Sequence, residues 1–496
     1  MLGLVRDQVI AWTFGAGAGT DAFFVAFKIP NFMRRLFAEG AFSLAFVPVL
    51  TEYKSQRPFE ELKAFVDRVA GTLGAVLLLV TLLGVLGAPL VIALFAPGFL
   101  SAEGEEKYAL AVEMLRLTFP YLFFISLTAF AGGILNAHNR FAVPAFTPVL
   151  LNLSLIGCAL WLVPHMAEGK EVIALAWGVL LAGIVQLTFQ LPFLQRLHLL
   201  PKPVVAPKDE GVRRIGRLML PALFGVSVSQ INLLLDTLIA SFLVSGSITW
   251  LYYSDRLMEF PLGMLGVALG TVILPNLSRN HAESSPQEFS NTMDWALRWV
   301  LLLGLPAAVG LFVLAGPMLT TLFQYKAFTG NDVAMAARSL MAYSFGLVGF
   351  ILIKVLAPGF YARQDTKTPV RIAVIAMVTN MVLNIALVFP LAHAGLALAT
   401  TLSAYLNAFL LFRGLRREGV YQPRQGWRLL ILRGAVACGV MAGLLLWGAG
   451  SLELWLALDV WGRIWRLLAW IGAGGAVYFA TLLLLGVRLH HFRSAA

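Results

Sequence analysis

The sequence predicts an all-α polytopic membrane protein with about fourteen transmembrane helices. The chain has 496 residues, of which 59% are hydrophobic and 13% are charged, whereas about a quarter of the residues in an ordinary soluble domain are charged. Apolar runs of roughly 20 residues or more recur along the chain, and each can cross a hydrocarbon core about 30 Å thick. Because these runs lack the alternation of barrel strands, the expected fold is a helical bundle.

Each predicted helix is an apolar run bounded by polar residues, glycine or proline, as at Gly15 and at Pro97-Gly98. The predicted ranges are 1–14, 19–50, 63–95, 106–136, 144–164, 171–195, 214–243, 247–276, 291–323, 332–361, 369–390, 393–413, 428–450 and 463–487. Little sequence remains between these ranges, so no sizeable soluble domain is expected.

The distribution of cations predicts the orientation. Most Lys and Arg residues outside the spans lie in one alternate set of loops, and the opposite set holds little beyond Lys107, Lys170, Lys326 and Arg463. By the positive-inside rule the cation-rich set is cytoplasmic, which places loops 96–107 and 325–332 outside. The net charge of +11 therefore mostly reflects topology. Anionic headgroups of the inner leaflet are the expected partner of these loops, and no nucleic-acid partner is expected.

Several chemistries lack a supporting motif. Cys158 and Cys438 lie inside apolar helices and are interpreted as packing residues. The histidines show no metal-ligand spacing, and the sequence has no Gly-x-x-x-x-Gly-Lys-Ser/Thr loop. We therefore expect neither catalytic residues nor a cofactor, and no ATP hydrolysis by this chain.

A shift of 228 residues aligns two halves of the sequence. The aligned pairs include Lys28 with Arg256, Pro89 with Pro317, Phe95 with Phe323, and Asn152 with Asn380. Six helices fit within this offset, and an even number returns the chain to its starting side, so the halves are predicted to be parallel repeats. We predict an N-terminal lobe at 1–200, a C-terminal lobe at 201–425 and a final helical pair at 426–496.

The same register predicts that the first helix is truncated. The seventh predicted helix begins near Arg214, and the position 228 residues earlier falls before Met1. The expectation is therefore that the first helix lacks its cytoplasmic half. The opening segment does not have the pattern of a cleavable signal peptide.

The stretch FFVAFKIPNFMRRLFAEGAFS, residues 23–43, carries charges inside a predicted membrane helix. At about 1.5 Å per residue, Lys28 lies roughly 12 Å below the outer end of this helix, and Arg34 and Arg35 lie roughly 21 Å below it. Snorkelling cannot easily bring the two arginines to water. They are therefore candidates for a site within the membrane.

Two further cations have similar depths. Arg256 lies roughly 14 Å below the outer end of the eighth predicted helix, and Arg6 is similarly placed in the first. Because Lys28 and Arg256 are equivalent in the two halves, we expect the cations to converge on a hydrated cavity near the repeat axis. Guanidinium groups bind phosphate bidentately, so an anionic ligand with phosphate oxygens is predicted.

An alternative interpretation is that each cation is neutralised by a nearby acid. Arg35 and Glu39 are four residues apart, and Arg256 and Glu259 are three apart, so each pair can meet on one helical face. Asp21 lies at the outer start of its helix, where capping that helix and facing the cavity are both open roles.

Three motifs resemble a known family: TDAFFVAFKIPNFMRRLFAEGAFSLAFVPVLTEYK (20–54), YYSDRLMEFPLGMLGVALGTVILPNLS (252–278) and KVLAPGFYARQDTKTPV (354–370). They closely resemble the MurJ/MviN family of lipid II flippases, within the MOP superfamily of exporters. The resemblance implies two six-helix lobes and a final pair that forms a lipid-facing groove. It also implies alternating access that moves the undecaprenyl-pyrophosphate-linked peptidoglycan precursor, lipid II, from the inner to the outer leaflet of the bacterial cytoplasmic (inner) membrane.

The resemblance also implies site residues and partners. Its cavity cations match Arg6, Arg34, Arg35 and Arg256, with Lys28 adding positive field, and its acidic partners match Asp21, Glu39, Asp255 and Glu259. Candidate ligands for a sodium ion are Asp236, Asn380, Asn384 and Thr401. The two asparagines could equally form an interhelical hydrogen bond, and coupling to sodium, protons or membrane potential is left open. Lipid II, the membrane and cell-wall synthesis proteins are the implied partners.

Three rival functions have distinguishable signatures. A related exporter of another lipid-linked oligosaccharide would need a substrate assay to separate it from a lipid II flippase. A multidrug or cation antiporter should have a cavity dominated by carboxylates. A membrane glycosyltransferase should have large outer loops with catalytic acids, whereas the outer loops predicted here are short.

Overall fold

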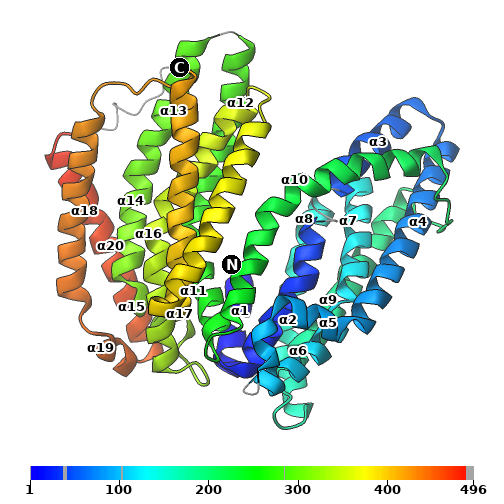
Figure 1. Cartoon of the computed structure of the whole chain (residues 1–496), viewed down its shortest axis with the longest axis horizontal. Helices are drawn as coiled ribbons and strands as arrows, with labels where there is room; N and C mark the ends of the chain where they lie inside the picture. The colour runs from blue at the N-terminus through cyan, green and yellow to red at the C-terminus, as the bar shows by residue number, and fades with distance from the viewer. Residues whose placement is uncertain (1, 37–41, 102–103, 284, 488–496) are drawn as a thin grey trace. The chain divides into compact units, whose positions relative to one another are not determined.

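The computed structural model describes residues 2–36, 42–101, 104–283 and 285–487. Within these ranges every regular element is helical (Figure 1), so the predicted all-α class is confirmed. Ten helices in the described part of the chain are long and apolar enough to cross a membrane. The count of fourteen stays a prediction, because several predicted spans consist of two or three shorter helical elements.

Contacts between Cα atoms divide the chain into two compact units, Met1–Thr249 and Trp250–Ala496. The first unit contains α1 (Leu2–Phe14), α2 (Ala18–Arg34), α3 (Ser43–Gln56), α4 (Phe59–Leu86), α5 (Ala88–Phe95), η2 (Pro97–Leu100), α6 (Glu105–Thr118), α7 (Tyr121–Ala137), α8 (Ala142–Gly157), η4 (Cys158–Leu162), η5 (Val163–His165), α9 (Ile173–Arg196) and α10 (Glu210–Ala240). Helix α11 (Ser247–Pro261) begins in this unit and continues into the second. The lobe boundaries at 200/201 and 425/426 stay predictions.

The second unit continues from α11. It contains η6 (Leu262–Val267), α12 (Ala268–Ala282), α13 (Pro286–Trp299), η7 (Val300–Gly304), α14 (Leu305–Val313), α15 (Ala315–Phe323), α16 (Gly330–Tyr361), α17 (Lys367–Arg417), α18 (Trp427–Ala449), α19 (Leu452–Ala457) and α20 (Val460–Leu484). The segments η6 and η7 are π-helical, and each interrupts a longer helical run. In α17 the backbone leaves helical geometry at Ala392, with φ 49° and ψ −131°. This is where the sequence predicts the boundary between helices 369–390 and 393–413.

Three long helices begin at residues that cap them. The Asp209 carboxylate accepts hydrogen bonds from the backbone N–H groups of Gly211 and Val212 at the start of α10. At the start of α16, Thr329 and Asp332 form a reciprocal capping box. Asp459 accepts from the N–H of Gly462 in α20. Such caps satisfy N–H groups that have no partner within the helix, and so they fix where each helix begins.

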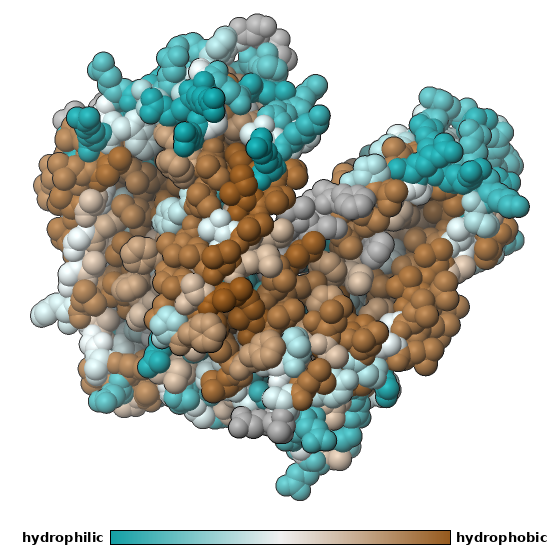
Figure 2. All heavy atoms as spheres, in the orientation of Figure 1, coloured by the Kyte–Doolittle hydropathy of each residue, from teal (hydrophilic) through white to brown (hydrophobic). Residues whose placement is uncertain are grey.

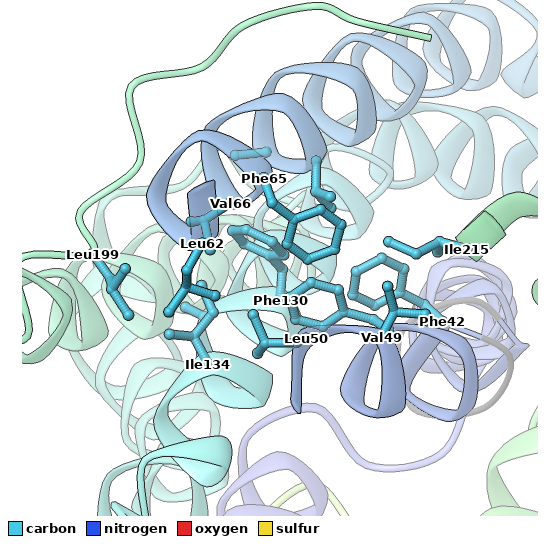
Figure 3. Packing of buried hydrophobic residues seen from close by; sticks show 14 of the residues in the cluster. Phe42, Val49, Leu50, Leu62, Phe65, Val66, Phe130, Ile134, Leu199 and Ile215 are labelled. Carbon is cyan, nitrogen blue, oxygen red and sulfur yellow. The ribbon is translucent and has the colours of Figure 1, made fainter. Parts of the chain in front are cut away.

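Aromatic rings form the core of the first unit, between α3, α4 and α7 (Figure 3). The ring of Phe46 lies 5.0 Å from that of Phe42 and 5.0 Å from that of Phe130. The ring of Phe65 lies 6.3 Å from that of Phe46. All four side chains are buried, and offset or tilted rings at these distances stabilise one another beyond the burial of their area.

The connection between α9 and α10 lies along α4 in an extended conformation. The Asp67 side chain accepts from the N–H of Lys202, and its backbone carbonyl accepts from the N–H of Val204 at 3.0 Å. The Thr72 hydroxyl accepts from the N–H of Ala206 at 3.0 Å. A Cβ atom at Gly71 would lie 2.3 Å from the backbone of Val204. The absence of a side chain at Gly71 therefore allows the connection to approach α4 this closely.

Ion pairs join α4 and α10 to neighbouring segments at the helix ends that are predicted to be cytoplasmic. Arg68 of α4 lies 2.6 Å from Asp209, and Arg214 of α10 lies 2.8 Å from Glu52 of α3. The hydrogen bond from Arg214 holds the pKa of the Glu52 carboxyl below its ordinary value. Because Arg214 and Glu52 are both well exposed, we assign this pair little net stability.

In the second unit a single buried carboxylate holds the connection between α17 and α18. Asp294 of α13 accepts hydrogen bonds from the Arg298 guanidinium, the Tyr421 hydroxyl, the Arg424 backbone N–H and the Trp427 indole, at distances from 2.7 to 3.1 Å. Hydrogen bonds to a charged acceptor are stronger than neutral ones. The connection is therefore fastened to α13 immediately before the final helical pair begins.

The final pair, α18 and α20, packs on η7 and α14 of the second unit. The Tyr478 hydroxyl donates to the Leu302 carbonyl at 2.8 Å. The opposite side is apolar and exposed, with 83% of Trp447 and 67% of Trp461 accessible. Figure 2 shows hydrophobic side chains over the flanks of each unit and hydrophilic ones towards their ends, as expected for surfaces that face lipid.

Arg463, near the start of α20, holds the end of this pair that is predicted to face outside. Its guanidinium is buried and donates to the carbonyls of Trp455, Leu456 and Gln324 at 2.9 to 3.0 Å. It also lies 5.2 Å from the centre of the Tyr325 ring. Carbonyl oxygens and an aromatic face thus surround this cation.

A glycine pair on α4 tests the close approach of the extended connection. Gly71→Ala should lower the thermal midpoint of unfolding relative to Gly74→Ala, because a Cβ at 71 meets the Val204 backbone and a Cβ at 74 meets nothing within 4 Å. Both substitutions gain the same helix propensity, and overpacking costs about 1–3 kcal/mol. The measurement is thermal unfolding in detergent. Equal midpoints would contradict the described approach.

Candidate functional site

The predicted site cation of α1 is buried beside an acid. Arg6 is 5% exposed and its neighbour Asp7 is 1% exposed. The Arg6 Nε and Nη2 atoms donate to Oδ1 of Asp7 at 2.9 and 2.6 Å. The two opposite charges therefore compensate each other, as a pair this deeply buried requires.

The predicted cations of α2 have neutral oxygen partners. The Lys28 ammonium donates to the Thr237 hydroxyl of α10 at 2.6 Å. Arg34 donates through Nε and Nη2 to the Asn31 side-chain oxygen at 3.0 and 2.8 Å. Both cations are partly exposed. Both of these oxygen partners are neutral.

Arg35 lies next to Arg34 but points about 100° away around the helix axis. It is partly exposed, and no hydrogen bond or ion pair joins its side chain to another described residue. Glu39, its predicted partner, lies outside the described residues. The predicted pairing of Arg35 with Glu39 therefore stays a prediction.

Asp21 fixes the start of α11. It is 1% exposed, and its carboxylate accepts from the Gly246 N–H at 2.7 Å, the Thr249 N–H at 2.9 Å and the Thr249 hydroxyl at 2.7 Å. Its own helix, α2, is instead capped by Thr20, whose hydroxyl accepts from the N–H of Gly17. A carboxylate at a helix N-terminus is favoured both by these donors and by the helix dipole.

Thr249 was not predicted as a site residue, although the repeat contained the signal. It lies 228 positions after Asp21, which is the offset that aligns the two halves. The predicted repeat register therefore pairs Asp21 with a residue that it contacts in the structure.

The predicted residues of α11 form a local pair in the second unit. The Arg256 Nη1 atom donates to Glu259 Oε2 at 2.8 Å, as the three-residue spacing predicts. The Arg256 Nε atom donates to the Tyr252 hydroxyl at 3.3 Å, and the guanidinium lies 5.3 Å from that ring. The Arg256 and Glu259 side chains are 37% and 45% exposed, so a ligand has access to both. Asp255, the remaining predicted acid, is partly exposed on the same helix.

The candidate sodium ligands do not all lie in one unit. Asp236 belongs to α10 of the first unit, whereas Asn380, Asn384 and Thr401 are buried in α17 of the second. The Asn384 amide donates to the Asn380 oxygen at 2.9 Å, and the Thr401 hydroxyl donates to the Ala342 carbonyl at 2.8 Å.

The bond from Asn384 to Asn380 joins residues four apart on one helix, and not two helices as the alternative interpretation has it. Contacts between helices come instead from the Asn380 amide, which donates to the Thr400 hydroxyl beyond the break in α17 at 3.3 Å, and from the bond of Thr401 to α16. The searched part of the chain contains no group of three or more His, Cys, Asp or Glu side chains that could hold a metal ion. The sodium site stays a prediction.

Comparison with known proteins decides the family. The family model described as "Lipid II flippase MurJ" matches residues 10–461. The chain belongs to the lipid II flippase MurJ family. Among the curated MurJ proteins, the "Probable lipid II flippase MurJ" of Vibrio cholerae is 52% identical over 500 residues, covering 100% of this chain and 95% of that protein. The "Lipid II flippase MurJ" of Burkholderia cenocepacia is 44% identical over 500 residues, covering 100% of this chain and 96% of that protein.

Solved structures agree with the MurJ assignment. A structure described as "Lipid II flippase MurJ, inward closed conformation" matches with a TM-score of 0.80 and 27% identity, over 97% of this chain and 95% of that one. A multidrug resistance MATE family transporter of the MOP superfamily matches with a TM-score of 0.68 and 15% identity, over 85% of this chain and 95% of that one. At that identity the second likeness shows the fold alone.

The carboxylate at the start of α11 gives a stability prediction for this MurJ-family chain. Asp21→Asn should lower the thermal midpoint of unfolding. The substitution replaces a charged carboxylate with a neutral amide, and the NH2 group of that amide would face backbone N–H donors. Hydrogen bonds to charged groups contribute about 1.5–3 kcal/mol.

The matched control is Asp459→Asn, since Asp459 is an N-cap in an exposed hydrogen bond and asparagine caps equally well. Thermal unfolding of both variants in detergent is the measurement. A midpoint for Asp21→Asn no lower than that of the control would contradict the structural role of Asp21.

Proposed function

We propose that this chain is a lipid II flippase, a membrane transporter that moves the undecaprenyl-pyrophosphate-linked precursor from the inner to the outer leaflet of the bacterial cytoplasmic membrane. The observation that carries the proposal is the 52% identity, over the whole chain, to a protein named as a probable lipid II flippase. The reaction class is translocation without a change in covalent bonds, so the chain is proposed as a transporter and not as an enzyme.

The chemistry of the accessible cations supports a pyrophosphate ligand. Arg34 and Arg256 lie in membrane helices, and each presents a partly exposed guanidinium. Their local acceptors, the Asn31 amide and the Glu259 carboxylate, can be exchanged for phosphate oxygens that a planar guanidinium binds bidentately. In this proposal Lys28 and Arg35 add positive field, and Arg6 contributes from its buried pair with Asp7.

The proposed mechanism is alternating access, in which accessible cations of the membrane helices bind the headgroup while the isoprenoid tail stays in lipid. The exposed apolar side of the final pair, with Trp447 and Trp461, supports its proposed role as the surface for that tail. A cation antiporter would instead gain from accessible carboxylates without cationic partners. Glu259, the exposed acid of α11, is paired with Arg256.

Membrane potential is one proposed source of energy. An anionic headgroup that moves outward travels down an inside-negative potential, which releases about 2.3 kcal/mol per elementary charge at 100 mV. The predicted sodium ligands supply the second proposal, coupling to a sodium gradient. Transport assays in vesicles with either gradient imposed alone separate the two.

The substrate class has a direct test. Mass spectrometry of lipids that copurify with the protein should find a pyrophosphoryl-linked precursor enriched over its abundance in the source membrane. The headgroup mass identifies the sugar and peptide carried. Enrichment of a different lipid-linked oligosaccharide would replace lipid II as the substrate, and enrichment of no polyprenyl lipid would count against the proposal.

The site has a genetic test. Arg34→Ala and Arg256→Ala should each fail to rescue a cell depleted of its own flippase, at membrane expression equal to that of the unsubstituted protein. Arg→Lys at either position should rescue only in part if two parallel hydrogen bonds to phosphate are required.

Arg363→Ala is the matched control, because Arg363 lies outside the membrane spans in an ion pair with Glu418 and should rescue normally. Normal rescue by either alanine variant would remove that arginine from the mechanism.

A further inference from the structure

A proline interrupts the hydrogen-bond pattern of the helix on which the final pair packs. Residues Pro286–Val313 form one apolar run of 28 residues, in which the π-helical segment η7 separates α13 from α14. We call this run the interrupted helix. Pro306 lies four positions after Leu302. Because proline has no backbone N–H group, Pro306 cannot donate to the Leu302 carbonyl as another residue of an α-helix would.

The final pair supplies a donor to that carbonyl. The Tyr478 hydroxyl of α20 donates to the Leu302 carbonyl oxygen at 2.8 Å, and the two residues are 1% and 5% exposed. Counted from the predicted cytoplasmic end at residue 291, Leu302 lies roughly 16 Å into the membrane. With no water in the bilayer core, a backbone group that a proline leaves open depends on donors from neighbouring helices. The Tyr478 hydroxyl therefore takes the place of the missing N–H donor.

The first unit provides an internal comparison. In the predicted 228-residue register the interrupted helix corresponds to α4, Phe59–Leu86, which also has 28 residues. Position 306 corresponds to Leu78, which has a backbone N–H group, and α4 is α-helical throughout. The interruption thus occurs in the copy on which the final pair packs, and the hydroxyl that compensates it comes from that pair.

Polar contacts hold the final pair to the rest of the second unit at three levels. Asp294 accepts from the start of α18 at the predicted cytoplasmic end, and Arg463 of α20 donates to the Gln324 carbonyl at the opposite end. The Tyr478 contact lies between these two. Apolar packing has no preferred direction, whereas a hydrogen bond does. The tyrosine contact therefore defines how the middle of α20 is placed against the interrupted helix.

We propose that Tyr478 is a positioning residue. It satisfies the carbonyl that Pro306 leaves without an α-helical donor, and it thereby sets the position of the final pair on the second unit. The consequence for transport rests on the proposed function, in which the exposed side of the pair accommodates the isoprenoid tail. A pair fastened to the interrupted helix presents that surface at a fixed position within the second unit.

A double-mutant cycle on the full chain tests the pairing. Tyr478→Phe removes the hydroxyl and keeps the ring. It should lower the thermal midpoint of unfolding in detergent, because a buried carbonyl loses its partner. Pro306→Ala supplies an N–H group at position 306. In that background Tyr478→Phe should cause about half the loss or less, because the Leu302 carbonyl then has another donor.

Tyr405→Phe is the matched control. The Tyr405 hydroxyl also donates to a backbone carbonyl of the second unit, that of Phe345, at 2.7 Å. The residue four positions after Phe345 is Gly349, which has an N–H group and lies in α16. The Phe345 carbonyl therefore keeps an α-helical donor. Tyr405→Phe should lower the midpoint less than Tyr478→Phe does, and equally in both backgrounds.

Position is measured separately from stability. Spin labels at Gln287→Cys in α13 and Leu483→Cys in α20, both at exposed positions, report the distance between the interrupted helix and the final pair. Cys158 and Cys438 are first replaced by alanine. Tyr478→Phe should shift or broaden the distance distribution, and Tyr405→Phe should leave it unchanged. An unchanged distribution for Tyr478→Phe would overturn the positioning role, and equal losses of midpoint in both backgrounds would overturn the pairing with Pro306.

Rescue of a cell depleted of its own flippase tests the consequence for transport. At equal membrane expression, Tyr478→Phe should rescue less well than Tyr405→Phe. Rescue by Tyr478→Phe equal to that of the unsubstituted chain would overturn its assignment to transport. Failure of the unsubstituted chain to rescue would instead count against the proposed function.

Discussion

The cost of placing charge in hydrocarbon is the constraint on which the rest of this structure depends. An uncompensated ion within a membrane helix is expensive, so each one needs a partner, a donor set or access to water. The structure uses several solutions. Arg6 is compensated by Asp7, Asp21 by backbone N–H groups and a hydroxyl, and Arg463 by carbonyl oxygens. Arg34 and Arg256 are partly exposed, and they are the cations to which the proposed function assigns the headgroup.

The features of the fold that depend on composition and on local residue spacing could be predicted from the sequence. The all-α membrane class follows from apolar run lengths, and the pairing of Arg256 with Glu259 follows from a three-residue spacing that any helix brings together. The break at Ala392 falls where the apolar pattern is interrupted. These features are determined by residues close together in the chain, which is why sequence patterns contain them.

Contacts between distant segments could not be predicted in this way. Asp21 was expected either to cap its own helix or to face a cavity, but it accepts hydrogen bonds from the start of α11. The Thr237 partner of Lys28 is 209 residues away. The approach of the extended connection to Gly71 depends on how α4 packs, which no periodicity encodes. The predicted 228-residue repeat is the long-range pattern in the sequence, and Thr249 lies at that offset from Asp21.

The carboxylate of Asp294 has a consequence for how motion in this transporter can be observed. Four donors from α13, from the connection after α17 and from the start of α18 converge on one buried acceptor. The connection is therefore held against α13 by several hydrogen bonds and is not a loose linker. A fluorophore or spin label attached to α18 or α20 would report the displacement of the second unit, and its signal could be analysed as rigid-body movement without a separate swing of the final pair.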